Sequence, residues 1–143
     1  MYIPEQFPPF HKKTLVVVAD HAHAKFFMGD DREFTFLEEL KTDYPSHGGG
    51  DRTSGVTSGG NVHFREVNEK DEAIGEDHLF RSLAKDLHAR FQKNEFEDLI
   101  IAAGPEVHKL ERLLDPEVHA CIKRLIPKLL VKLDDEHLIE HLA

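Results

Sequence analysis

The residues best suited to chemistry gather in one glycine-rich stretch, Tyr44 to Phe64, which reads YPSHGGGDRTSGVTSGGNVHF. Six of the nine glycines of the chain lie there, in a stretch with no apolar run and no helical period. Successive glycines can turn their backbone N–H groups toward a phosphate, and adjacent arginine or histidine side chains can contact phosphate or sugar. The candidate binding residues are His47, Gly48, Gly49, Gly50, Asp51, Arg52, His63 and Arg65. The alternative is a solvated surface loop that makes no specific contact.

Histidine suggests a second kind of site, because it is the commonest metal ligand and the chain has 11 of them. Asp20, His21 and His23 lie close together after an apolar run, and they are the candidate ligands for a divalent metal. His137 and His141 are four residues apart and would share a helix face, but neither pair has the HExxH spacing. We therefore predict no resident cofactor and keep a divalent metal as the alternative.

An enzyme built from these residues would take one of two forms. A hydrolase would use His47, Asp51 and Arg52, whereas a metal enzyme would use the Asp20 group. Nothing in the spacing of either set requires catalysis, so no catalytic residue is assigned. Cys121 is the single cysteine, and its position fits a small core residue better than a nucleophile.

The segments before the glycine-rich stretch predict strands. Thr14–Asp20 is a continuous apolar and β-branched run, which is typical of a strand buried on both faces. Ala24–Met28 and Glu33–Leu40 are the next expected strands, with a turn at residues 29–31. Asp98–Ala103 is a second buried strand. We expect an α/β fold with a mixed sheet of about five strands and flanking helices.

The segments after the stretch predict mainly helices. An acidic linker, Glu66–Asp77, is expected to lead into a helix over His78–Phe91, where apolar residues recur every three or four positions. Asp115 is the expected cap of a short helix, and Pro127 places the strand IPKLLVKL (126–133) at a sheet edge. A final helix is expected over residues 134–142, capped by Asp134 or Asp135. The proposed organisation is an extended tail, residues 1–13, followed by a single domain, residues 14–143, which the loop 44–64 interrupts.

Composition limits the partners. The formal net charge is -9, which opposes tight non-specific binding to nucleic acid, although the segment 41–65 is not acidic. No apolar run is long enough to span a bilayer, and the first residues, MYIPEQFPPFHKK, do not form a secretory signal. These observations predict a cytoplasmic protein without a membrane partner. They leave the oligomeric state open.

Several stretches in this order resemble the host attachment protein family of bacteria. The stretches are LVVVADHAHAKFF (15–27), the Gly-Asp-Arg step (50–52), FRSLAKDLHARF (80–91), DLIIAAGPEV (98–107) and IPKLLVKLDDEHLIEHL (126–142). That family is in turn similar to the middle domain of archaeal and eukaryotic peptide-chain release factors and of Pelota. The resemblance implies the RNase H-like α/β fold of that domain.

The resemblance also bears on activity. Release-factor middle domains carry Gly-Gly-Gln in the loop before the long helix, and this motif promotes hydrolysis of peptidyl-tRNA. The matching stretch here is Ser46-His47-Gly48-Gly49-Gly50-Asp51-Arg52, in which Gly50 or Asp51 stands in place of the glutamine. The resemblance thus predicts a non-catalytic binding or regulatory module that contacts the ribosome or tRNA through residues 46–65. The alternatives are the enzymes described above and an indirect role in attachment to host cells.

Overall fold

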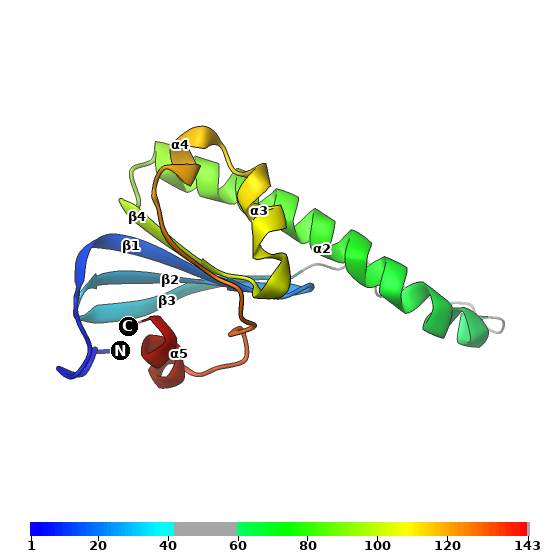
Figure 1. Ribbon diagram of the computed structural model, residues 1–143, viewed down its shortest axis with the longest axis horizontal. Helices are drawn as coiled ribbons and strands as arrows, with labels where there is room; N and C mark the ends of the chain where they lie inside the picture. The colour runs from blue at the N-terminus through cyan, green and yellow to red at the C-terminus, as the bar shows by residue number, and fades with distance from the viewer. Residues whose placement is uncertain (42–59, 143) are drawn as a thin grey trace.

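The computed structural model describes residues 1–41 and 60–142, and for residues 60–74 it describes the helical backbone without the side chains. The predicted α/β fold with a mixed five-stranded sheet is confirmed (Figure 1). The strands are β1 (Phe10–Ala19), β2 (His23–Asp31), β3 (Glu33–Lys41), β4 (Asp98–Ala102) and β5 (Ile122–Ile126). Their order across the sheet is β3-β2-β1-β4-β5, which places β1 in the centre.

The central strand β1 joins an antiparallel half of the sheet to a parallel half. It pairs antiparallel with β2, where Val16 faces Phe27, and parallel with β4, where Val16 faces Ile100. The parallel half continues to β5 at the edge. Residues 14–19 of β1 are buried, which explains why Leu15 to Ala19 are all apolar instead of alternating.

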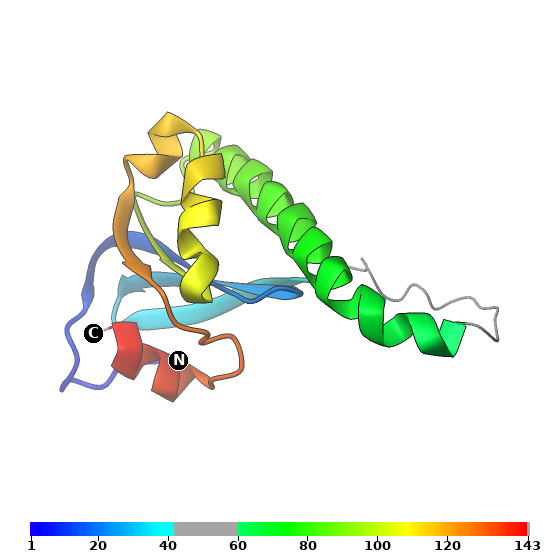
Figure 2. The same ribbon diagram turned by 45° about the vertical axis from the view of Figure 1, so that its right-hand side comes forward.

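Helices cover both faces of the sheet, so the domain has three layers (Figures 1 and 2). The helices are α2 (Gly60–Gln92), the 3-10 turn η2 (Gly104–Glu106), α3 (Val107–Leu113), α4 (Pro116–His119) and α5 (Asp135–Leu142). Leu15 and Val17 of β1 pack with residues of α2, α3 and α4, whereas Val16 and Val18 pack with residues of α5 on the opposite face. Among the described residues, no helix is both long and apolar enough to cross a membrane.

The long helix begins much earlier than predicted. It starts at Gly60 and runs for 33 residues, so the expected linker Glu66–Asp77 is helical. The prediction failed because it required an apolar stripe, which begins only where α2 meets the core at Leu79. Glutamate, lysine, arginine and alanine favour helix without such a stripe, and no proline interrupts the segment. Residues 60–64 of the predicted loop are therefore helix, and the rest of that loop lies outside the described residues.

The edge strand after α4 also lies earlier than predicted. β5 ends at Ile126, and residues 127–133 form no strand. Proline has no backbone N–H, so Pro127 ends the strand at the residue before it. Leu130 and Val131 are instead buried with residues of α5. The predicted position at a sheet edge is correct, since β5 is the last strand of the sheet.

The turn between β2 and β3 is displaced by two residues from its expected place. β2 continues to Asp31, whose φ of 53° makes the reversal, and β3 begins at Glu33. Gly29 lies within β2, where a Cβ would come as close as 2.5 Å to the Phe10 ring. Its glycine thus serves a close approach and not a turn.

The first residues of the chain pack against the sheet instead of hanging free. β1 begins at Phe10, four residues before the expected strand, and Ile3 is buried. The Ile3 backbone N–H donates to the Arg32 carbonyl at 2.7 Å, and the Arg32 guanidinium donates to the Phe7 carbonyl at 2.9 Å. These bonds hold the tail beside the β2–β3 turn and the face that α5 covers.

Candidate functional site

The predicted loop site is only partly within the described residues. His47, Gly48, Gly49, Gly50, Asp51 and Arg52 lie outside them, and their role stays a prediction. His63 and Arg65 lie on the helical backbone at the start of α2. The structure therefore places the end of the predicted site on a helix and not on a loop.

Helix α2 determines where that site lies relative to the domain. At 1.5 Å per residue its 33 residues span roughly 50 Å. Among residues 75–92, whose side chains the structure describes, Leu79, Phe80, Leu83 and Leu87 are buried in the core. Figures 1 and 2 both show the N-terminal part of α2 extending beyond the sheet. His63 and Arg65 thus belong to the end of the helix that is remote from the core.

A charged contact with α3 lies at the point where α2 meets the body of the domain. Lys109 Nζ of α3 lies 3.6 Å from Glu76 Oε1 of α2 and 3.2 Å from Glu106 Oε2. Burial raises the pKa of the Glu76 carboxyl, and the charge of Lys109 opposes that rise. The pKa of Lys109 is raised, first by its hydrogen bond to Glu106. We call Glu76, Glu106 and Lys109 the α2–α3 clamp.

The clamp lies near the carboxyl ends of β1 and β4, where ligands often bind in open α/β sheets. A positive charge on His21, which lies just after β1, would lower the pKa of the Glu76 carboxyl. The two side chains are therefore close enough for their charges to interact. A pocket of 240 Å³ beside the clamp is lined by Asp77, Phe80 and Arg112 among others. Lys109 is already paired with two carboxylates, so this pocket suits a structural contact better than a phosphate.

A second contact fixes the C-terminal end of α2 to the sheet. Arg90 Nε donates to Asp86 Oδ2 at 2.7 Å, Nη1 donates to Glu95 Oε1 at 3.2 Å, and Nη2 donates to Glu38 of β3. The guanidinium also lies 4.7 Å from the centre of the Phe26 ring. Burial would lower the pKa of Arg90, but its three carboxylate partners raise it. The charge is therefore kept in a side chain that is only 12% exposed.

The metal candidates serve the turn between β1 and β2. Asp20 Oδ1 accepts hydrogen bonds from the backbone N–H groups of Ala22 at 2.8 Å and His23 at 2.7 Å. His23 Nδ1 lies 3.5 Å from the same oxygen. Within the described residues, no group of three or more His, Cys, Asp or Glu side chains could hold a metal ion, and Asp20, His21 and His23 are among those residues. The metal hypothesis has no support from this geometry and stays a prediction.

Other candidates also have local partners. Asp115 and Asp134 cap α4 and α5 as predicted, because they accept from the N–H groups of Glu117 at 3.1 Å and His137 at 3.0 Å. Cys121 follows α4 and is partly buried against the core, and burial raises the pKa of its thiol. A raised pKa disfavours the thiolate, which agrees with a packing role.

No sequence pattern directly indicated the two contacts that hold α2. Glu38 and Arg90 are 52 residues apart, and no local pattern joins them. Glu76 was assigned to a linker, so its position on the face toward α3 could not be inferred. The visible spacings were i, i+3 for Glu106 and Lys109 and i, i+4 for Asp86 and Arg90.

Comparison with known proteins identifies one family and several distant structural matches, among them two archaeal proteins. The family model described as bacterial archaeo-eukaryotic release factor family 12 matches residues 13–142. The crystal structure of an archaeal translation termination factor, aRF1, matches with 11% identity and a TM-score of 0.49, over 90% of this chain and 36% of that chain. A structure described as an archaeal protein matches with 12% identity and a TM-score of 0.49, over 89% of this chain and 35% of that chain. The chain thus spans about a third of each, and no curated protein sequence matches it.

The family match confirms the predicted likeness to release factors. It covers the sheet, α2 and the helices that hold α2 in place. The name under which it is described says nothing of attachment to host cells, so that part of the prediction stays a prediction.

Proposed function

The chain belongs to the bacterial archaeo-eukaryotic release factor family 12, and from this we propose that it is a translation-linked binding module. Its partner is the ribosome or tRNA, and the contact is made through residues 46–65. The module does not hydrolyse peptidyl-tRNA by the Gly-Gly-Gln route. The observation that carries the proposal is the family match over residues 13–142.

The absence of hydrolysis follows from the residues of the loop. The sequence after His47 is Gly-Gly-Gly-Asp-Arg, and it contains no glutamine that could orient a water molecule. Binding without hydrolysis is therefore the activity that these residues favour.

The geometry of α2 supports the assignment of the contact to residues 46–65. The α2–α3 clamp and Arg90 hold the C-terminal half of the helix on the domain. Figure 2 shows the start of α2 well away from the sheet. A contact at that end can enter a confined space in a large particle while the acidic body stays outside it.

The charge distribution limits how the contact forms. The whole chain has a formal net charge of -9, so the body is repelled by RNA. The segment 41–65 has Lys41, Arg52 and Arg65 against two aspartates, and it is the part that RNA would accept. Binding that depends on so few phosphate contacts should be weak and should fall as salt increases.

Co-sedimentation with ribosomes tests the proposal. The intact chain, a chain lacking residues 47–59, and the double variant Arg52→Gln/Arg65→Gln are centrifuged with ribosomes at low and at high salt. A double variant Lys128→Gln/Lys132→Gln removes the same charge from exposed sites of the body and serves as the control. We expect the intact chain and the control to co-sediment at low salt, and both loop variants to be lost from the pellet.

Two results would contradict the proposal. If the intact chain never co-sediments, there is no ribosome contact of this kind. If the chain lacking residues 47–59 co-sediments as well as the intact chain, the contact lies elsewhere. Release of the peptide from peptidyl-tRNA by the intact chain would contradict the non-catalytic part alone.

A further inference from the structure

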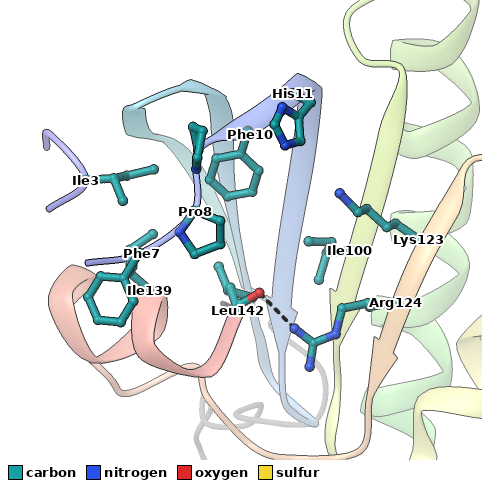
Figure 3. Close-up of a pocket in the computed structure, with 11 residues that line it drawn as sticks. Ile3, Phe7, Pro8, Phe10, His11, Ile100, Lys123, Arg124, Ile139 and Leu142 are labelled. Carbon is teal, nitrogen blue, oxygen red and sulfur yellow. Dashed lines mark hydrogen bonds between the residues drawn. The ribbon is translucent and has the colours of Figure 1, made fainter. Parts of the chain in front are cut away.

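A pocket on the face opposite α2 has a lining unlike the rest of the molecule. It has a volume of 250 Å³ and lies between the tail, the starts of β1 and β5, and α5 (Figure 3). None of its lining residues is acidic, although the chain has 27 aspartates and glutamates and a net charge of -9. An acid-free pocket in so acidic a chain is a local feature that calls for a physical reason.

The body of the pocket is apolar. Its apolar lining includes Ile3, Phe7, Phe10, Ile100, Ile139 and Leu142. These residues belong to the hydrophobic cluster on the α5 face of the sheet, which also contains Val16 and Val18. The floor of the pocket is therefore formed by apolar core side chains. Burial of an apolar group in it would contribute a favourable free energy of about 25 cal/mol for each Å² of apolar surface removed from water.

The rim of the pocket is cationic. Lys123 and Arg124 come from β5, and His11 comes from β1. In Figure 3 the ammonium group of Lys123 points from β5 toward the side of the pocket on which His11 lies. Arg124 Nη1 donates to the Leu142 carbonyl at 2.8 Å, and this acceptor is neutral.

Neither cation of the rim is neutralised by the part of the chain whose side chains are described. No ion pair joins Lys123 or Arg124 to a carboxylate among residues 1–41 and 75–142. By contrast, Arg81, Arg90 and Lys109 all have carboxylate partners. Two adjacent unpaired cations beside an apolar surface are complementary to an anion with an apolar body.

We propose that this pocket binds a small monocarboxylate with an apolar body. Its carboxylate pairs with Lys123 and with the free N–H groups of Arg124, and its hydrocarbon contacts Ile100, Ile139 and Phe10. The volume equals the liquid volume of about eight water molecules, so the ligand has roughly eight to ten non-hydrogen atoms. Hexanoate and benzoate have this size. The proposal stands independently of any contact with the ribosome, because the pocket lies on the face away from α2.

The test uses the intact chain and ¹H–¹⁵N correlation spectra during titration with hexanoate or benzoate. We expect shifts at the amides of His11, Ile100 and Lys123, with saturation. Hexanol has the apolar body without the charge, and acetate has the charge without the body. We expect each of them to bind at least tenfold more weakly than hexanoate, since each lacks one of the two contacts.

Substitution of the rim gives the matched comparison. Lys123→Gln removes one cation from an exposed position and should weaken hexanoate binding roughly tenfold, the usual value of a hydrogen bond to a charged group. His11→Gln should weaken it less, and Lys128→Gln, an equal charge change outside the pocket, should not alter it. The proposal is overturned if Lys123→Gln and Lys128→Gln bind hexanoate equally, or if the shifts map elsewhere. Tighter binding of phenyl phosphate than of benzoate would overturn the choice of carboxylate.

Discussion

Substitution of Arg90 by methionine should destabilise the domain more than any other single change to its surface ion pairs. Methionine keeps most of the aliphatic stem, so the loss is mainly that of the guanidinium contacts. The side chains of the three carboxylate partners are 35%, 36% and 47% exposed, so solvent screens the ion pairs. Loss of each pair should therefore lower the free energy of unfolding by only about 0.2–1 kcal/mol. The contact with Phe26 adds about 0.5–1 kcal/mol. The free energy of unfolding should fall by about 2 kcal/mol.

Urea unfolding followed by circular dichroism at 222 nm measures this difference, because the chain has no tryptophan for fluorescence. With an unfolding entropy near 2.1 cal/mol/K per residue, a loss of 2 kcal/mol lowers the Tm by roughly 6–7 °C. Arg81→Met is the control, since the ion pair described for Arg81 is the one with Asp77, and the two side chains are 63% and 56% exposed. It should cost no more than about 0.5 kcal/mol.

Equal losses in the Arg90 and Arg81 variants would refute this reasoning. They would mean that the position of Arg90 between the sheet and α2 adds nothing to an ordinary helix-surface pair. Arg90→Lys refines the comparison, because lysine keeps the charge but cannot reach several carboxylates at once. Its loss should lie between those of the methionine variant and the unaltered chain.

Three further changes have defined outcomes. Gly104→Ala should lower the free energy of unfolding by about 1–2 kcal/mol, since Gly104 has a φ of 73° and the added Cβ would lie 2.6 Å from the Leu129 side chain. A loss below about 0.5 kcal/mol in urea unfolding would contradict this expectation. The hydrogen bond that the His137 ring donates to Asp134 raises the pKa of His137 above 6.5, so the stability it adds is complete below pH 6.5 and is lost as pH rises through the raised value. NMR titration should show this pKa returning toward 6.5 in Asp134→Asn. Burial raises the pKa of the Glu76 carboxyl above 4.5. Its contribution to the free energy of unfolding is therefore complete below pH 4.5 and is lost as pH rises through the raised pKa. Glu76→Gln should remove that part of the pH dependence of unfolding.

The parts of the fold that could be predicted are those with a strong local pattern. β1 was recognisable because a strand buried on both faces must be apolar at every position, and Leu15 to Ala19 meets that condition. The caps at Asp115 and Asp134 were recognisable because a carboxylate before a helix satisfies backbone N–H groups within three residues. Both signals are complete within a short window of sequence.

The parts that failed depend on what lies outside such a window. The first half of α2 has no apolar stripe, so periodicity could not show that it is helical. Pro127 was correctly placed at a sheet edge, but whether it began or ended a strand depended on pairing with β4. The metal site at Asp20 stays a prediction, and the sequence alone could not show that its carboxylate accepts hydrogen bonds from its own turn. The acid-free pocket joins residues from the tail, three strands and α5, which only the folded chain brings together.

The contrast between the two ends of α2 has a mechanical consequence. Between Glu76 and Gly60 the helix runs about 24 Å at 1.5 Å per residue. A tilt of about 10° at the Glu76–Lys109 contact would therefore sweep Gly60 along an arc of about 4 Å, while atoms beside Leu83 would move only about a quarter to a half as far. The segment from Gly60 to Glu76 is thus a long arm, and a small change in its angle at the domain becomes a displacement of several ångströms at its far end.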